Sequence, residues 1–289
     1  MEDQSFFVQQ PHRETMKTKR VFYATLLFFF ITGCATPTPA PTAIPTETSA
    51  PRPTATLTPT ATPIPIPPLR VRGLAYSPYR DCQSPDTEAI PSLDQVYEDL
   101  EIVAKMANGI RTYASTGINA KIPAVARGMG LRVSAGAWLD DDKEANQREI
   151  AGVIELAQNV ELESVIVGNE VLLRGDLSEE ELLGYIEQVK AAVDVPVTTA
   201  EIGSLLLQHP KVMQAVDFQM VHLYPFWEGQ SIENAARAVV QRYHEIEEAA
   251  DGKRVVIGET GWPSAGPQFS TALPSPENQR RFVQEFISL

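Results

Sequence analysis

Short apolar runs alternate with longer segments in which apolar residues recur every three or four positions, from residue 69 to the end of the chain. A short apolar run between turn residues predicts a buried strand, and the longer repeat predicts a helix with one buried face. The predicted strands are Val71–Tyr76, Gly109–Ala114, Leu131–Leu139, Ser164–Leu172, Val195–Ile202, Phe218–Trp227 and Arg254–Trp262.

The segments between these strands predict helices with recognisable starts. Ser275 before Pro276 predicts an N-cap followed by the first helical position. Two earlier helices begin with the three-residue spacing of a capping box, Ser92 with Gln95 and Ser178 with Glu181. The sequence therefore predicts strand–helix units in regular succession.

Alternating strands and helices indicate an α/β fold with a parallel sheet. The units recur about every 30 residues, which is the spacing of a (β/α)8 TIM barrel of about 250 residues. An open, doubly wound sheet is the alternative. Such a sheet usually carries a Gly-rich phosphate turn after its first strand, and the segment 73–81 has none. We therefore expect a TIM barrel.

Only seven strands and seven helices are predicted, and the last helix pattern ends with the chain. A closed barrel needs an eighth strand, and without it Val71–Tyr76 and Arg254–Trp262 would have unpaired edges. We therefore expect the eighth βα unit to be missing from the barrel domain, residues 69–289. Either the chain is truncated at its C-terminus or the unit lies outside this chain.

Residues 1–34 have the layout of a secretory signal whose true start is Met16. Basic residues follow Met16, and the apolar run from Val21 to Ile31 is too short for a stable membrane-spanning helix. The ending "ITGC" resembles a bacterial lipobox, which implies cleavage before Cys34 and lipidation of its sulfur. An ordinary signal peptide and a marginal membrane anchor are the alternatives.

Residues 35–68 are rich in Thr and Pro and predict an extended, disordered linker. A degenerate low-complexity insert would be disordered in the same way. With a lipid at Cys34, this linker would hold the barrel domain away from a membrane. We expect an exported protein that is anchored at the cell surface.

The charge and the cysteines narrow the choice of partners. Of 24 Lys and Arg and 37 Asp and Glu residues, 5 and 4 lie in the first 68 positions, which leaves the barrel domain with a net charge of −14. Such a domain is a poor partner for nucleic acid, whereas a neutral sugar polymer is compatible. Only two cysteines are present, so a lipidated Cys34 leaves Cys82 without a disulfide partner.

Functional residues of a barrel gather at the C-terminal ends of its strands. Here these ends carry two carboxylates, Glu170 and Glu259. Glycoside hydrolysis needs such a pair, one group to protonate the leaving oxygen and one to attack or to activate water. The same strand ends carry aromatic and hydrogen-bonding residues: Tyr76, Arg111, Tyr113, Trp138, Asn169, His222, Tyr224, Phe226, Trp227 and Trp262.

Three of these strand ends read "VGNEVL", "HLYPFW" and "IGETGWPS". Together they resemble glycoside hydrolase family 17, and "RTY" and "GLAYSPY" on the first two strands fit the same pattern. The resemblance extends from Arg70 to Leu289. It implies a retaining β-1,3-glucanase in which Glu170 is the acid/base and Glu259 the nucleophile. Relatives in this family act on mixed-linkage glucan or transfer glucan chains.

Each site residue has an expected role and a simpler interpretation. Apolar surroundings and the charge of Glu259 are expected to raise the pKa of Glu170, while Arg111 keeps Glu259 ionised. Asn169 is expected to bind the sugar 2-hydroxyl, although it could only cap its strand. The tryptophans could be ordinary packing residues, and His222 a structural one. The expected substrate-binding residues are Tyr76, Arg111, Tyr113, Asn169, His222, Tyr224, Trp227 and Trp262.

No cofactor and no metal are expected, because the sequence has no HExxH motif, Cys/His cluster, G-x-S-x-G elbow or P-loop. Our interpretation is a monomeric, surface-anchored hydrolase of β-1,3-glucan. A glucan transglycosylase that uses the same residues is one alternative. A non-catalytic glucan-binding protein of the cell surface is the other.

Overall fold

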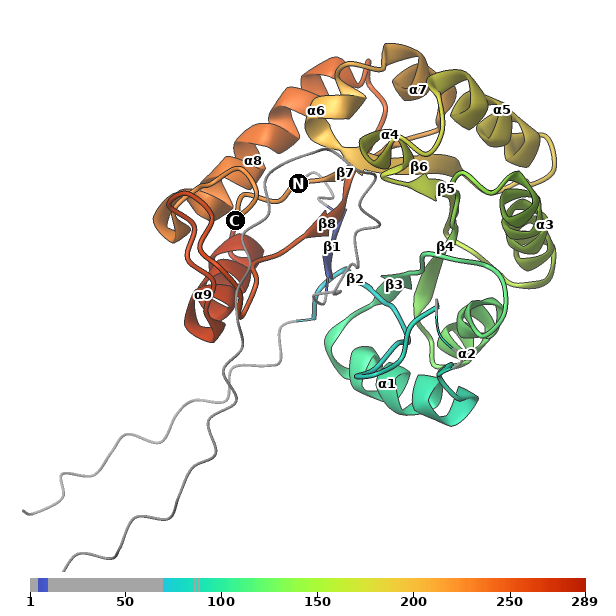
Figure 1. Cartoon of the computed structure of the whole chain (residues 1–289), viewed down its shortest axis with the longest axis horizontal. Helices are drawn as coiled ribbons and strands as arrows, with labels where there is room; N and C mark the ends of the chain where they lie inside the picture. The colour runs from blue at the N-terminus through green and yellow to red at the C-terminus, as the bar shows by residue number, and fades with distance from the viewer. Residues whose placement is uncertain (1–4, 10–69, 86, 88) are drawn as a thin grey trace, which may run out of the picture. The chain divides into compact units, whose positions relative to one another are not determined.

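The computed structural model of the chain describes residues 5–9, 70–85, 87 and 89–289. Within these residues, parallel strands form a closed barrel in the order β1 to β8, with the helices outside it (Figure 1). The strands are β1 (Ser5–Gln9), β2 (Gly73–Ala75), β3 (Gly109–Arg111), β4 (Arg132–Ala137), β5 (Ser164–Asn169), β6 (Val197–Ile202), β7 (Gln219–His222) and β8 (Val255–Thr260).

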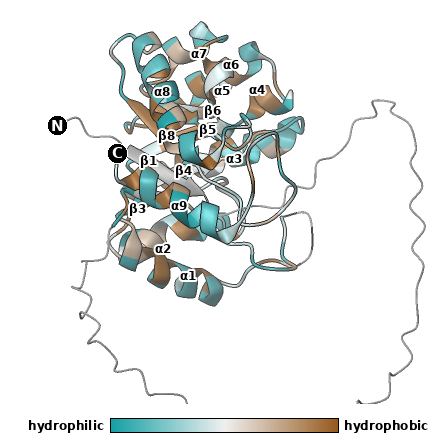
Figure 2. Cartoon of the chain, turned by 90° about the vertical axis from the view of Figure 1, so that its left-hand side faces the viewer, coloured by the Kyte–Doolittle hydropathy of each residue, from teal (hydrophilic) through white to brown (hydrophobic). Residues whose placement is uncertain are grey.

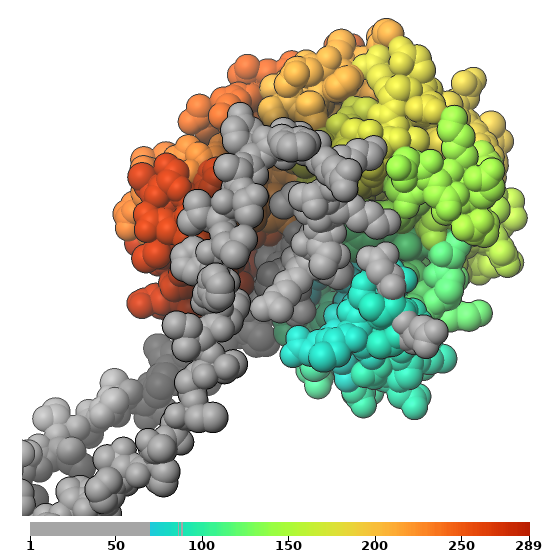
Figure 3. Space-filling view, in the orientation of Figure 1, coloured from blue at the N-terminus to red at the C-terminus, as the bar shows by residue number. Residues whose placement is uncertain are grey.

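The helices follow the strands in chain order. Around the described part of the chain, the colours of Figure 3 run in sequence order from cyan to red. Both predicted capping boxes are present, and Ser275 caps the last helix with Pro276 in its first turn. The helices are α1 (Leu93–Met106), η1 (Asn119–Lys121), α2 (Ile122–Gly128), α3 (Lys143–Asn159), α4 (Val171–Arg174), α5 (Glu179–Lys190), α6 (Gly203–Leu206), α7 (Pro210–Ala215), α8 (Ile232–Ala249) and α9 (Pro276–Ile287).

All seven predicted strands are confirmed as β2 to β8, and the described residues contain no eighth unit of a strand followed by a helix. The expectation that the first and last of these strands have unpaired edges is wrong. β1 lies between β2 and β8 and is parallel to both, with Phe7 beside Gly73 and Ser5 beside Val256. A strand from the N-terminal end thus fills the eighth position and closes the ring.

Several sequence predictions lie outside the described residues. The apolar run of the signal, Cys34 and the Thr/Pro-rich linker are among them. β1 belongs to the segment that precedes the predicted start at Met16. In the described part of the chain, the helices fall short of the length and apolar character that a membrane span requires.

Apolar side chains pack in two places, one between strands and helices and one inside the barrel. The outer cluster includes Val165 and Val167 of β5, and the amphipathic helices cover it with one face while the other stays hydrophilic (Figure 2). The inner cluster consists of Ala75, Ile166, Ala200, Phe218, Met220 and Val256. This inner cluster fills the barrel, so polar side chains are left to its C-terminal rim.

Candidate active site

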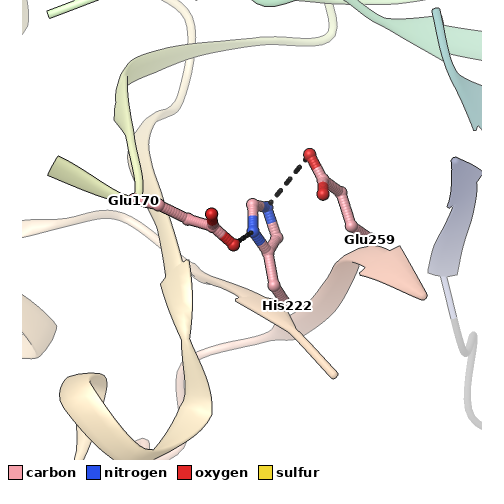
Figure 4. Close-up of side chains that lie close together, drawn as sticks. All are labelled: Glu170, His222 and Glu259. Carbon is pink, nitrogen blue, oxygen red and sulfur yellow. Dashed lines mark hydrogen bonds and ion pairs between the residues drawn. The ribbon is translucent and has the colours of Figure 1, made fainter. Parts of the chain in front are cut away.

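The C-terminal rim of the barrel brings Glu170, His222 and Glu259 together from the ends of β5, β7 and β8. Figure 4 shows the imidazole of His222 between the two carboxylates. One oxygen of Glu170, one of Glu259 and a ring nitrogen of His222 all lie within 4.8 Å of one another. Both carboxylates predicted from the strand ends therefore meet in one cluster.

A bulge in β8 directs Glu259 into the barrel. Val256 faces the interior and Ile257 the outer core, so strict alternation would turn Glu259 outward. Gly258 is an extra residue in the ladder with β7, and Glu259 instead of Gly258 lies opposite His222. A Cβ at Gly258 would lie 2.6 Å from Cγ of Met220, so the close strand approach at this bulge requires glycine.

β5 uses the same device before Glu170. Its register against β6 shifts so that Asn169, rather than Gly168, lies opposite the inward-facing Ala200. Gly168 has φ +78° and Glu170 has φ +53° and ψ +32°. The left-handed region costs a non-glycine residue about 1–2 kcal/mol, so the chain holds Glu170 in a strained conformation at the end of the strand.

Glu259 is almost fully buried and is held from several sides. Tyr113 donates to its Oε1 at 2.6 Å and Tyr224 to its Oε2 at 2.8 Å. Nη1 of the fully buried Arg111 lies 3.3 Å from Oε1. The predicted contact of Arg111 with Glu259 is thus present, and loss of one partner of such a buried ion pair costs about 3–5 kcal/mol.

The two tyrosines remain neutral donors to Glu259. Burial raises the pKa of the Tyr113 hydroxyl well above its usual value, and the negative charge of Glu259 raises it further. The same two causes raise the pKa of Tyr224. Both hydroxyl groups therefore keep their protons, and Glu259 can only accept from them.

His222 links the two halves of the cluster, and its partners determine its tautomer. Its Nε2 lies 2.8 Å from Nη1 of Arg111, and a guanidinium group only donates. The proton of the neutral imidazole therefore sits on Nδ1, which donates to Oε1 of Glu170 at 2.7 Å. Arg111 also donates to Oδ1 of Asn169 at 2.7 Å. Two residues predicted for the site, His222 and Asn169, therefore belong to one hydrogen-bond network with Arg111.

The expectation of a raised pKa for Glu170 is wrong for the free site. Burial does raise the pKa of this carboxyl group, but the hydrogen bond from His222 and the charges of Arg111 and Arg174 lower it more. The result lies below the ordinary value of 4.5. Sequence reasoning counted the apolar flanks of Glu170 and omitted the donors that only the folded barrel brings to it.

Glu170, His222 and Glu259 have the ligand types and the spacing of a metal site. The guanidinium of Arg111 lies against two of them, 2.8 Å from His222 and 3.3 Å from Glu259. Its positive charge opposes a second cation, and both ring nitrogens of His222 already have hydrogen-bond partners. The cluster thus fits proton transfer and charge stabilisation better than metal binding.

Three predicted aromatic residues do not join the hydrogen-bonded cluster. The hydroxyl of Tyr76 donates to Asp99 of α1 at 3.0 Å, and its ring packs in the outer core. Trp262 is buried, donates to the carbonyl of Leu273 and packs between Phe226 and Phe282. Trp227 is 64% exposed after β7 and makes T-shaped contacts with Phe226 and Phe269.

Sequence reasoning missed Glu201, a carboxylate at the end of β6. Its side chain is 1% exposed and accepts hydrogen bonds from the backbone N–H groups of Ile202, Leu172 and Leu173. Burial raises the pKa of Glu201, and its hydrogen bonds with Ile202 and Leu173 counteract this. A charged residue at the end of a buried strand was the available signal, the same one that identified Glu170.

Arg174 of α4 connects the segment after β4 to the end of β5. Arg174 stacks on Trp138 at 4.4 Å and donates to the carbonyl groups of Leu139 and Asn169. These contacts fix the polypeptide on either side of Glu170. The arrangement as a whole offers one partly exposed carboxyl group and one rigidly held carboxylate that face each other.

Comparisons with known proteins identify similar glycoside hydrolases. The chain matches the BtgE/BtgC glycoside hydrolase domain over residues 73–288. It is 30% identical over 215 residues to a glucan 1,3-beta-glucosidase of Schizosaccharomyces pombe, which covers 67% of both chains. It is 29% identical over 196 residues to a putative glucan endo-1,3-beta-glucosidase, btgC, of Aspergillus niger, and this match spans 61% of the chain but 28% of that relative.

A solved structure shares both the fold and part of the sequence. It is an active-site mutant of a β-1,3-glucanosyltransferase from Rhizomucor miehei in complex with laminaritriose. The match has a TM-score of 0.66 and 30% identity, and it covers 75% of this chain and 80% of the other.

Proposed function

Because the chain belongs to the BtgE/BtgC glycoside hydrolase domain family, within glycoside hydrolase family 17, we propose that it is a retaining hydrolase of β-1,3-glucan. The named relatives are a glucan 1,3-beta-glucosidase and a putative glucan endo-1,3-beta-glucosidase. The acidic domain with its exposed Trp227 suits a neutral polysaccharide, whose apolar sugar faces stack on aromatic rings.

The separation of the two carboxyl groups carries this proposal. Oxygens of Glu170 and Glu259 approach within 4.8 Å. Retaining enzymes place their carboxyl groups about 5–5.5 Å apart, whereas inverting enzymes need roughly 6.5–9.5 Å to admit a water molecule. The spacing supports a direct attack on the sugar by one carboxylate, with retention of the anomeric configuration.

The environments of the two groups support distinct roles. Glu259, held by Arg111 and two tyrosine hydroxyls, attacks the anomeric carbon while Glu170 transfers its proton to the departing oxygen. Glu170 then takes a proton from water, the water oxygen bonds to the anomeric carbon, and Glu259 leaves. Proton and bonds balance over the two steps, and Glu170 ends in its starting form.

The neighbours of this pair serve the sugar. Asn169, fixed by Arg111, is in a position to bind the 2-hydroxyl group, whose hydrogen bond strengthens in the transition state. Trp227 provides an apolar face for a sugar ring. Tyr76 keeps a place in the fold rather than a substrate contact, since its hydroxyl belongs to Asp99.

Hydrolysis of laminari-oligosaccharides by the full chain tests the proposal. Proton NMR of the first products should show the β-anomer before mutarotation, and Glu259→Gln should abolish release. First products with the α-anomer would contradict retention. Equal release by Glu259→Gln and the parent chain would contradict the nucleophile assignment.

A β-1,3-glucan transglycosylase is the second candidate, and the match to a β-1,3-glucanosyltransferase favours it. The same glycosyl-enzyme would then react with a sugar hydroxyl in place of water. Products longer than the supplied oligosaccharide would identify transfer. Binding of laminarin without any release would instead identify a surface glucan-binding protein.

We also propose that the chain is exported and anchored to a membrane through a lipid on Cys34. The order of the basic, apolar and small-residue zones before Cys34 supports this. Labelled palmitate should enter the expressed protein and be lost from Cys34→Ser. Retention of label in that variant would contradict the lipidation site.

A further inference from the structure

Glu201 is a buried carboxylate at the same end of the barrel as Glu170 and Glu259, and the two proposed chemical steps do not use it. Its Oε2 accepts from the N–H groups of Leu172 at 3.1 Å and Leu173 at 3.2 Å. Its Oε1 accepts from the N–H group of Ile202 at 2.8 Å. Glu201 thus uses both of its oxygens to accept hydrogen bonds from the main chain.

Two of these three donors belong to the first turn of α4, the short helix that begins directly after Glu170 (Figure 1). The first N–H groups of a helix have no partner inside the helix. Glu170 stands at the N-cap position, but its side chain makes no capping hydrogen bond. Glu201 supplies the missing acceptor from the neighbouring strand β6.

The α4 turn in turn determines the direction of Glu170. The backbone of Glu170 has a left-handed conformation, which a glutamate adopts only when its surroundings hold it there. Its N–H group donates to the carbonyl of Ala200 at 2.8 Å, and its own carbonyl accepts from the N–H group of Arg174 at 2.9 Å. The second of these bonds closes the turn that Glu201 caps.

We propose that Glu201 is a positioning residue, which fixes the α4 turn and thereby holds the carboxyl group of Glu170 opposite the anomeric oxygen to be protonated. The proposal rests on the acid/base role proposed for Glu170. It assigns to β6 a part in proton transfer that acts through the main chain of α4.

The test compares substrates that need a proton with substrates that do not. A glucose leaving group departs only when its oxygen is protonated, whereas an acidic dinitrophenol departs without help. In Glu201→Gln, one oxygen is replaced by an NH2 group that cannot accept from the backbone. We expect kcat/KM to fall about 10- to 100-fold on laminari-oligosaccharides and less than about threefold on a dinitrophenyl β-laminarioside.

Asp217→Asn is the matched control. Asp217 also accepts from a backbone N–H group of β6, that of Val197, but at the opposite end of the strand. It should change kcat/KM on the two substrates by the same factor. Circular dichroism and melting temperature report the folding of each full-length variant, and Glu201→Asp, which shortens the reach, is a second variant for the same comparison.

A double-mutant cycle separates this proposal from the proposed function. If Glu201 acts through Glu170, adding Glu201→Gln to Glu170→Gln causes no further loss on the oligosaccharide. Equal losses of kcat/KM on both substrates in Glu201→Gln, or full additivity with Glu170→Gln, would overturn the positioning role. An unselective loss in Glu170→Gln alone would instead overturn the acid/base assignment of Glu170.

Discussion

Glu170 and Glu259 are chemically identical, but the barrel holds them in different ways. Glu259 ends β8 with 4% of its side chain exposed and accepts from Tyr113 and Tyr224 beside Arg111. Glu170 stands on a left-handed turn with 18% of its side chain exposed, and His222 is its donor. A nucleophile benefits from rigid placement, whereas an acid/base must exchange protons with a leaving group and with water.

Arg111 connects the two environments without making them equal. It lies 3.3 Å from Glu259, whereas its hydrogen-bonded link to Glu170 runs through the imidazole of His222. A negative charge on Glu259 is therefore neutralised locally, which limits its influence on Glu170. The difference between the two carboxyl groups therefore arises from their neighbours. Substitutions and pH changes test this difference, with the largest expected effect first.

Glu259→Gln should lower kcat/KM by about 10⁴-fold or more, because it removes the proposed nucleophile that would form the glycosyl-enzyme. The loss should be the same on oligosaccharides and on dinitrophenyl glycosides, since both need the attack. Initial rates on the two substrates measure it, with circular dichroism as the folding control. Retention of activity on either substrate would assign the attack to another group.

Glu170→Gln should lower kcat/KM on laminari-oligosaccharides by about 10²- to 10⁴-fold, the usual contribution of a general acid. The dinitrophenyl glycoside should lose far less in kcat/KM, because its leaving group needs no proton. The loss of kcat/KM on each of the two substrates is compared with the corresponding loss in Glu259→Gln, and this comparison distinguishes the two carboxyl groups. An identical pattern in both variants would remove the functional difference between them.

Tyr113→Phe and Tyr224→Phe should each lower kcat/KM about 10- to 100-fold, because each removes a hydroxyl donor from the buried Glu259. The loss should be independent of the leaving group, as expected for the nucleophile side. Kinetics on both substrates measure it, and Tyr185→Phe on the exterior helix α5 serves as the control. A loss of kcat/KM on the oligosaccharide alone would show that these tyrosines support the acid/base, Glu170, instead.

The pKa of Glu170 lies below 4.5 in the free site, so the alkaline limb of kcat/KM should lie at acidic pH. Bound glucan covers the exposed part of Glu170 and removes its solvent, which raises the pKa, so the limb of kcat should lie at higher pH. Rate profiles on an oligosaccharide measure both limbs. Coincident limbs would contradict this effect of the substrate.

The same pKa has a consequence for stability. A carboxyl group whose pKa is lowered by folding stabilises the protein above its unfolded value of about 4.5. That contribution is lost as the pH falls through the folded value. The melting temperature of the parent chain should therefore fall more than that of Glu170→Gln on acidification below this range.

The smallest expected effect concerns the strand neighbours. β8, which carries Glu259, has the N-terminal strand β1 as one of its two neighbours. The neighbours of β5, which precedes Glu170, are β4 and β6. A chain that begins at Met16 lacks β1 and exposes an edge of β8, so its melting temperature should be about 5 °C lower. Calorimetry measures this. An unchanged melting temperature would show that pairing with β1 does not stabilise the barrel.

Much of the fold was predictable because its signals are local. The apolar runs of β2 to β8 and the capping boxes at Ser92 and Ser178 act over a few residues, and all of them are present. β1 was not predicted, because Ser5–Gln9 is short and its pairing partners lie at both ends of the barrel domain. Strand partners far apart in sequence leave no local pattern.

The sequence predicted which strand ends carry the candidate site residues. It did not predict the hydrogen bonds that connect their side chains. Glu170, Glu259, Arg111 and His222 do meet. Tyr76 turns to α1 instead, and Glu201 was overlooked because its partners are backbone groups of another strand's turn. Position along the chain identifies a strand end, whereas the direction of a side chain depends on the neighbouring strands.

The sequence by itself determined the seven strand–helix units and the two carboxylates at their ends, because periodic burial and capping are local. Tertiary structure decided where those carboxylates point. Gly168 and Gly258 each add one residue to a ladder, and the shift turns Asn169 and Glu259 inward. An extra residue becomes a bulge only against a neighbouring strand, so the alternation of one strand could not disclose it.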